Sequence, residues 1–105
     1  MSAPEESYRI ASDDSKARDR RTDAIDDLEL ANECGRLAAL VRDDALEESL
    51  RRRALSALAS PQCASTLADL ATDESLPASL RGEAADLSEE LGDPDGTPGT
   101  EGRRP

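Results

Sequence analysis

Two stretches that lie thirty residues apart decide the fold: LAALVRDDALEESLRRRA, residues 37–54, and LADLATDESLPASLRGEA, residues 67–84. Nine positions are identical between them: Leu37/Leu67, Ala38/Ala68, Leu40/Leu70, Asp43/Asp73, Leu46/Leu76, Ser49/Ser79, Leu50/Leu80, Arg51/Arg81 and Ala54/Ala84. A weaker third copy lies upstream, where Arg21, Ala24, Ile25 and Leu28 align with Arg51, Ala54, Leu55 and Leu58. A fixed period of this length predicts a stack of repeated supersecondary units.

The composition favours an all-helical fold. The chain has 105 residues, which suits one small domain, and its only aromatic residue is Tyr8. The core must therefore consist of leucine and alanine, with Ile25 and Val41. Leucine and alanine favour helices, whereas the β-branched and aromatic residues that favour strands are scarce.

The apolar periodicity predicts five helices in a domain spanning residues 12–92. The first begins after Ser12 and carries the stripe Ala17, Ala24, Ile25 and Leu28. The second begins after Asn32 as its N-cap and ends near residue 43. The others cover about residues 47–59, 61–71 and 77–91. Residues 1–11 and 93–105 lack an apolar stripe and are predicted to be a disordered N-terminal arm and a disordered C-terminal tail.

The charge balance is strongly acidic. The formal net charge is −11, from 24 acidic and 13 basic residues, and Lys16 is the only lysine. Such a charge argues against direct binding to nucleic-acid phosphates or to an anionic membrane. The many acidic residues and the near absence of lysine favour a halophilic, haloarchaeal source. In such a cell, high salt screens the repulsion between the acidic side chains. The alternative explanation is a GC-rich genome, which also replaces lysine by arginine.

Cys34 and Cys63 are the only cysteines, and they occupy similar places in their repeats. The favoured interpretation is two small buried thiols, and the alternative is a disulfide between adjacent repeats. A zinc site lacks ligands, because the chain has no histidine and no further cysteine. The N-terminal residues do not resemble a signal peptide, and no apolar run could span a bilayer, so we expect a cytoplasmic protein.

The repeat unit is a helix with LAxL, an aspartate-rich loop and a helix with SLRxxA. It resembles the short HEAT-like repeat found in phycobilisome lyases and in many small bacterial and archaeal proteins. The resemblance covers about residues 17–92 and implies a short right-handed α-solenoid. It gives structural roles to Asp43 and Asp73, Arg51 and Arg81, and Ala54 and Ala84. Because the upstream copy shows no recognisable first helix and loop, we expect about two and a half hairpins.

The residues offer little for catalysis. Without histidine, imidazole bases and Ser–His or Cys–His pairs are excluded. No glycine-rich phosphate loop is present, and adjacent carboxylates such as Asp43 and Asp44 are interpreted as solvated surface charge. We therefore expect no enzymatic activity, no catalytic or metal site and no cofactor.

The densest basic run is Arg51, Arg52 and Arg53. Arg51 recurs in the repeats, so we expect it to pair with an aspartate or with carbonyls of the neighbouring repeat. Arg52 and Arg53 do not recur and, with Glu83, are the candidate partner-binding residues.

These observations favour a non-enzymatic protein–protein interaction module, an adaptor or scaffold. The expected partner is another protein or a second copy of this chain, with no direct contact to nucleic acid or membrane. Two alternatives belong to other classes. One is an accessory subunit or lyase-like chaperone of an enzyme system, by analogy of fold alone. The other is an acidic mimic of nucleic acid.

Overall fold

Six α-helices and no β-strand make up residues 3–91, the part of the chain that the computed structural model describes. The helices are α1 (Pro4–Ser12), α2 (Arg18–Leu30), α3 (Cys34–Arg42), α4 (Glu48–Ala57), α5 (Ala64–Ala71) and α6 (Ala78–Leu91). A short 3-10 helix, η1 (Pro61–Cys63), precedes α5. The all-α prediction is confirmed, whereas the expected count of five helices is wrong. The predicted tail, residues 93–105, lies outside the described residues.

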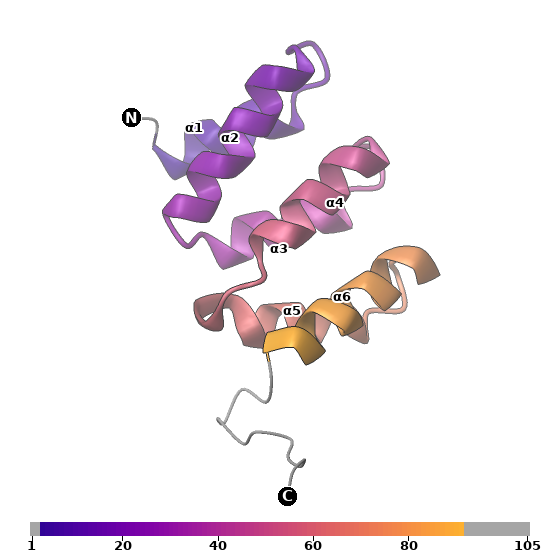
Figure 1. The fold of residues 1–105 in the computed structure, drawn as a ribbon. Helices are drawn as coiled ribbons and strands as arrows, with labels where there is room; N and C mark the ends of the chain where they lie inside the picture. The colour runs from indigo at the N-terminus through magenta and orange to yellow at the C-terminus, as the bar shows by residue number, and fades with distance from the viewer. Residues whose placement is uncertain (1–2, 92–105) are drawn as a thin grey trace, which may run out of the picture.

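Consecutive helices pair into three hairpins, α1–α2, α3–α4 and α5–α6, which lie one after another along the molecule (Figure 1). The second helices α2, α4 and α6 lie in one layer, and α1, α3 and α5 lie in a layer behind them. Each helix contacts its equivalent in the adjacent hairpin. Among residues 3–91, no helix combines the length and the apolar character that a membrane crossing requires.

The N-terminal hairpin is complete, which corrects the expectation of a disordered arm over residues 1–11 for all but residues 1–2, which lie outside the described residues. Pro4 opens α1, and Glu5 and Glu6 occupy its first turn, where negative charge favours a helix N-terminus. The domain therefore begins at α1, and α2 begins at Arg18 rather than after Ser12. The sequence pattern missed α1 because serine and alanine, not leucine, are its buried residues.

The same aspartate turn joins the two helices of each hairpin. Asp13, Asp43 and Asp73 follow α1, α3 and α5, and each Oδ1 accepts the backbone N–H two residues later at 3.0, 3.0 and 2.9 Å. Each aspartate carbonyl also accepts the N–H three residues later. A side chain that mimics a backbone turn in this way fixes the chain reversal. Asp43 and Asp73 thus lie in the loops between the paired helices, and Asp13 has the same place in the first hairpin.

Leucine and alanine fill the core, as predicted. Leu40, Leu70, Ala54 and Ala84 are all fully buried in one continuous cluster. Small residues at equivalent places let the helices approach closely. Ser7 occupies the position of Leu37 and Leu67, and its buried hydroxyl has no hydrogen-bond partner among the described residues.

Asn32 ends α2 instead of capping the next helix. Its φ of 56° is left-handed, a conformation that asparagine tolerates better than most residues. The N–H of Glu33 donates to the Leu28 carbonyl, and the N–H of Asn32 donates to the Glu29 carbonyl. This pair of hydrogen bonds is the Schellman motif, which satisfies carbonyls at a helix C-terminus. The predicted N-cap is therefore wrong, and α3 begins at Cys34.

A disulfide joins Cys34 to Cys63, with 5.5 Å between their Cα atoms. The bond links the start of α3 to η1, and so ties the second hairpin to the third. The favoured expectation of two reduced, buried thiols is wrong, and the alternative of a disulfide between adjacent repeats is correct. The similar places of the two cysteines in their repeats bring them together when the hairpins stack.

Reducing this disulfide should destabilise the protein. Its cysteines are 29 residues apart, and closing a loop of that length in the unfolded chain contributes about 3.5 kcal/mol. We expect dithiothreitol to lower the free energy of unfolding measured by urea titration. The double variant Cys34→Ala/Cys63→Ala, as control, should not respond to the reductant. A wild-type unfolding midpoint that is the same with and without dithiothreitol would contradict the linkage.

Candidate functional site

The arginine that repeats every thirty residues joins the two helices of a hairpin. Arg51 Nε donates to the Val41 carbonyl at 2.8 Å, and Arg21 Nε donates to the Ala11 carbonyl at 3.0 Å. Both acceptors lie in the last turn of the first helix, where carbonyls have no partner within the helix. The carbonyl contact was expected, but it lies in the same hairpin and not in the neighbouring repeat. Arg51 and Arg21 are therefore buried structural residues.

Arg81 differs from its two equivalents. By the repeat, its acceptor would be the carbonyl of Ala71, yet its buried Nε has no hydrogen-bond partner among residues 3–91. Ala84, beside it on α6, is fully buried, as are Ala54 and, almost completely, Ala24. The alanine position thus repeats three times, whereas the arginine hydrogen bond repeats twice.

The predicted partner-binding residues lie together on the layer of second helices, but they bind one another and their neighbours. Arg52 on α4 forms ion pairs with Glu48 at 3.1 Å and with Glu83 of α6 at 2.7 Å. Arg53 forms ion pairs with the other neighbouring helix, through Asp26 and Glu29 of α2. These residues therefore bridge α2, α4 and α6. Arg52 keeps 45% of its side chain exposed.

Two further ion pairs connect adjacent hairpins. Arg18 at the start of α2 contacts Glu47 and donates to the Ser49 hydroxyl at 2.6 Å. Arg42 at the end of α3 contacts Asp73 at 2.6 Å. Exposed pairs of this kind contribute about 0–1 kcal/mol each. Their effect on the molecule is to neutralise arginines within an acidic surface and to set the hairpins in register.

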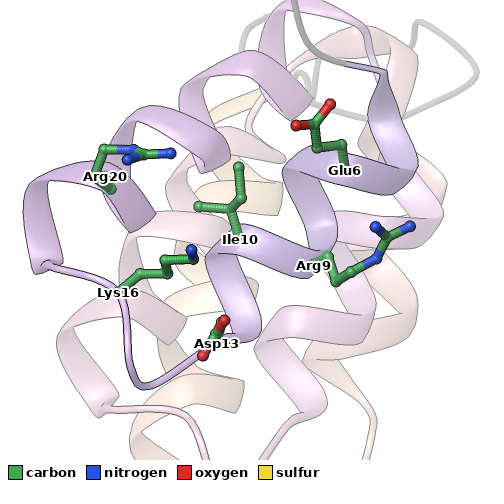
Figure 2. A pocket seen from close by; sticks show the side chains of 6 residues that line it. All are labelled: Glu6, Arg9, Ile10, Asp13, Lys16 and Arg20. Carbon is green, nitrogen blue, oxygen red and sulfur yellow. The ribbon is translucent and has the colours of Figure 1, made fainter.

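A shallow pocket of about 260 Å³ lies beside the first hairpin (Figure 2). Ile10 is its apolar residue, and charged side chains from α1, the following loop and α2 surround it: Glu6, Arg9, Asp13, Lys16 and Arg20. In Figure 2, Lys16 and Arg20 lie on the side of the pocket opposite to α1. Three cations thus line one hollow of a protein whose net charge is −11.

The sequence analysis predicted no site at the pocket residues, although a signal existed. Lys16 and Arg20 align with Leu46 and Leu50 in the second repeat, so the alignment places two cations at core positions. The partners of Arg52 and Arg42 could also have been found, because Glu83 and Asp73 each lie 31 residues further on, one repeat plus one residue.

Among the described residues, no group of three or more cysteine or carboxylate side chains is placed to hold a metal ion. Comparison of the chain with protein families, with curated proteins and with solved structures found no match.

The aspartate turn also sets the ionisation of Asp73. The Ser75 hydroxyl donates to its carboxylate at 2.6 Å, and Arg42 and the Ser75 backbone N–H donate as well. Together they lower the pKa of Asp73 to about 2. This pKa is lower than in the unfolded chain, so the ionised Asp73 carboxylate stabilises the folded state. That contribution is complete above about pH 4 and is lost as the pH falls toward 2.

Removing the largest contributor should raise this pKa. We expect Ser75→Ala to move the pKa of Asp73 toward its ordinary value of 3.8, as measured by NMR titration of the carboxyl carbon. The loss of stability on acidification, which starts near the unfolded-chain pKa of 3.8, should then be smaller and should end at a higher pH. Ser79→Ala, which lies outside the turn, is the control. An unchanged Asp73 pKa in Ser75→Ala would show that the hydroxyl does not hold the carboxylate.

Proposed function

We propose that the three hairpins form a short HEAT-like α-solenoid and that the protein is a non-enzymatic interaction module. The observation that carries this proposal is the layer formed by α2, α4 and α6. Stacked repeats of this kind present a surface that continues from one repeat to the next and is suited to binding an extended partner.

The charges on this layer indicate how a partner would be selected. Arg52 lies at its centre, between Glu48 of its own helix and Glu83 of α6. An arginine already held by two carboxylates presents a fixed guanidinium edge, and little side-chain entropy is lost when a partner carboxylate or carbonyl approaches. Charged residues of this type contribute to selectivity and association rate more than to affinity.

The proposed partner is another protein. The two remaining hypotheses, a lyase-like chaperone and an acidic mimic of nucleic acid, have no specific contact in their favour. The arginines of this layer interrupt the rows of carboxylates that a mimic would need. A salt-adapted cytoplasm stays our prediction for its environment.

Site-specific photo-crosslinking tests the proposal. A photoreactive residue at Ser56, exposed on α4 one turn after Arg52, should crosslink to a discrete protein in an extract of the cells that make this chain. The matched position is Ser65, exposed on α5 in the other layer, which should give no such product. Adding Arg52→Gln to the Ser56 probe should reduce the yield, with helicity by circular dichroism as the folding control.

Unlabelled wild-type protein should compete for the crosslinked species, and mass spectrometry identifies it. Equal products from both positions, or none from Ser56, would contradict binding on the α2–α4–α6 layer. A product that is a second copy of the chain would identify self-association as the function of this surface.

A further inference from the structure

The pocket of the first hairpin arises from two substitutions in the repeat. At the positions of Lys16 and Arg20, the second hairpin has Leu46 and Leu50, and the third has Leu76 and Leu80. These four leucines are at most 5% exposed and belong to the core. Lys16 and Arg20 are exposed instead.

Because of this exchange, no leucine at these two positions shields Ile10, the apolar residue of the pocket, from solvent. Ile10 aligns with Leu40 and Leu70, which are fully buried, yet Ile10 itself is only half-buried. A polar outer surface on a terminal repeat favours solubility. Solubility alone does not require a hollow with an aliphatic side chain in it.

The cations around this hollow are the second observation. Five surface arginines elsewhere in residues 3–91 form ion pairs: Arg18, Arg36, Arg42, Arg52 and Arg53. Arg9, Lys16 and Arg20 form none with any described residue, although acidic side chains are abundant. All three line the pocket.

We propose that this pocket binds an acidic peptide segment of a partner protein through an aliphatic side chain next to carboxylates. The aliphatic group packs on Ile10, which has lost the leucine cover of the later hairpins. The carboxylates pair with Lys16 and Arg20 in charge-assisted hydrogen bonds. The site shares α2 with the α2–α4–α6 layer, through Arg20, but none of its residues belongs to the ion pairs of Arg52 and Arg53, and it does not depend on binding there.

The rim of the pocket favours a peptide over a phosphate-bearing ligand. Glu6 and Asp13 lie beside the three cations, and they would repel two negative charges concentrated on one phosphate more strongly than the same charge spaced apart on two carboxylates. The pocket also offers an apolar contact that a phosphate would leave unused. The overall negative charge does not prevent binding, because repulsion from charges beyond about 10 Å is screened at 0.1 M salt.

NMR titration of the full chain tests this site. The probe is an equimolar pool of short blocked peptides, each with one leucine or isoleucine flanked by aspartate and glutamate. Its matched pool has serine in place of the aliphatic residue, and inorganic phosphate is titrated separately. We expect the aliphatic pool to shift the backbone amides of residues 6–20, with much smaller effects around Arg52 and Glu83.

The variant Lys16→Leu/Arg20→Leu restores the residues of the later hairpins, so it should fold, and it should weaken binding by about tenfold or more through loss of both charges. Lys16→Arg/Arg20→Lys should retain binding. Arg36→Gln, which removes a cation outside the pocket, should bind as the wild type does. The amide spectrum of α3–α6 reports whether each variant is folded.

Three results would overturn the proposal. If the serine pool or phosphate bound as tightly as the aliphatic pool, the pocket would be a general anion site. Shifts spread over the whole surface would show non-specific attraction. An absence of shifts in residues 6–20 with the aliphatic pool would show that the pocket does not bind such peptides.

Discussion

A buried arginine that donates to the end of the preceding helix is the contact on which the geometry of the first two hairpins depends. The last carbonyls of an α-helix have no partner within it, and a buried guanidinium N–H must also find an acceptor. Arg51 and the Val41 carbonyl solve both requirements at once, as do Arg21 and the Ala11 carbonyl. With the aspartate turn, this hydrogen bond sets how far the second helix lies along the first, and the leucine and alanine core follows from that register.

The first two hairpins share this plan, the third keeps the aspartate turn without the arginine hydrogen bond among the described residues, and all three differ according to their place in the stack. The middle hairpin has a neighbour on each side and buries the most residues on its second helix. The first hairpin has charged residues where later ones have leucine, which exposes Ile10 and opens the pocket. The last hairpin leaves Ala68, Ala71 and Ala85 half-buried where no further hairpin follows within the described chain. The ends thus differ in chemistry, one charged and one composed of small residues.

The composition predicted the all-α fold, and the apolar periodicity predicted the last four helices and the buried leucines, because a strong apolar stripe survives in both clear copies of the repeat. The periodicity missed α1, whose buried residues Ser7 and Ala11 carry too little hydrophobicity to mark a helix. Aligning Asp13 with Asp43 and Asp73 would have revealed it. The cysteine positions alone left the disulfide as the alternative interpretation, because pairing depends on how the hairpins stack. The ion pairs of Arg52 and Arg53 also required the stacked geometry, since their partners lie on other helices.

The most direct test of whether the arginine–carbonyl contact holds a hairpin together is to compare two variants, Arg51→Met and Arg81→Met. Urea titration measures the free energy of unfolding of each. Methionine keeps much of the apolar length of the side chain but donates no hydrogen bond. Arg51→Met should lower the free energy of unfolding by about 2 kcal/mol, as expected for a lost hydrogen bond from a charged group. Arg81→Met, whose Nε has no partner among the described residues, should have a much smaller effect. Equal losses in the two variants, or no loss in Arg51→Met, would contradict this account.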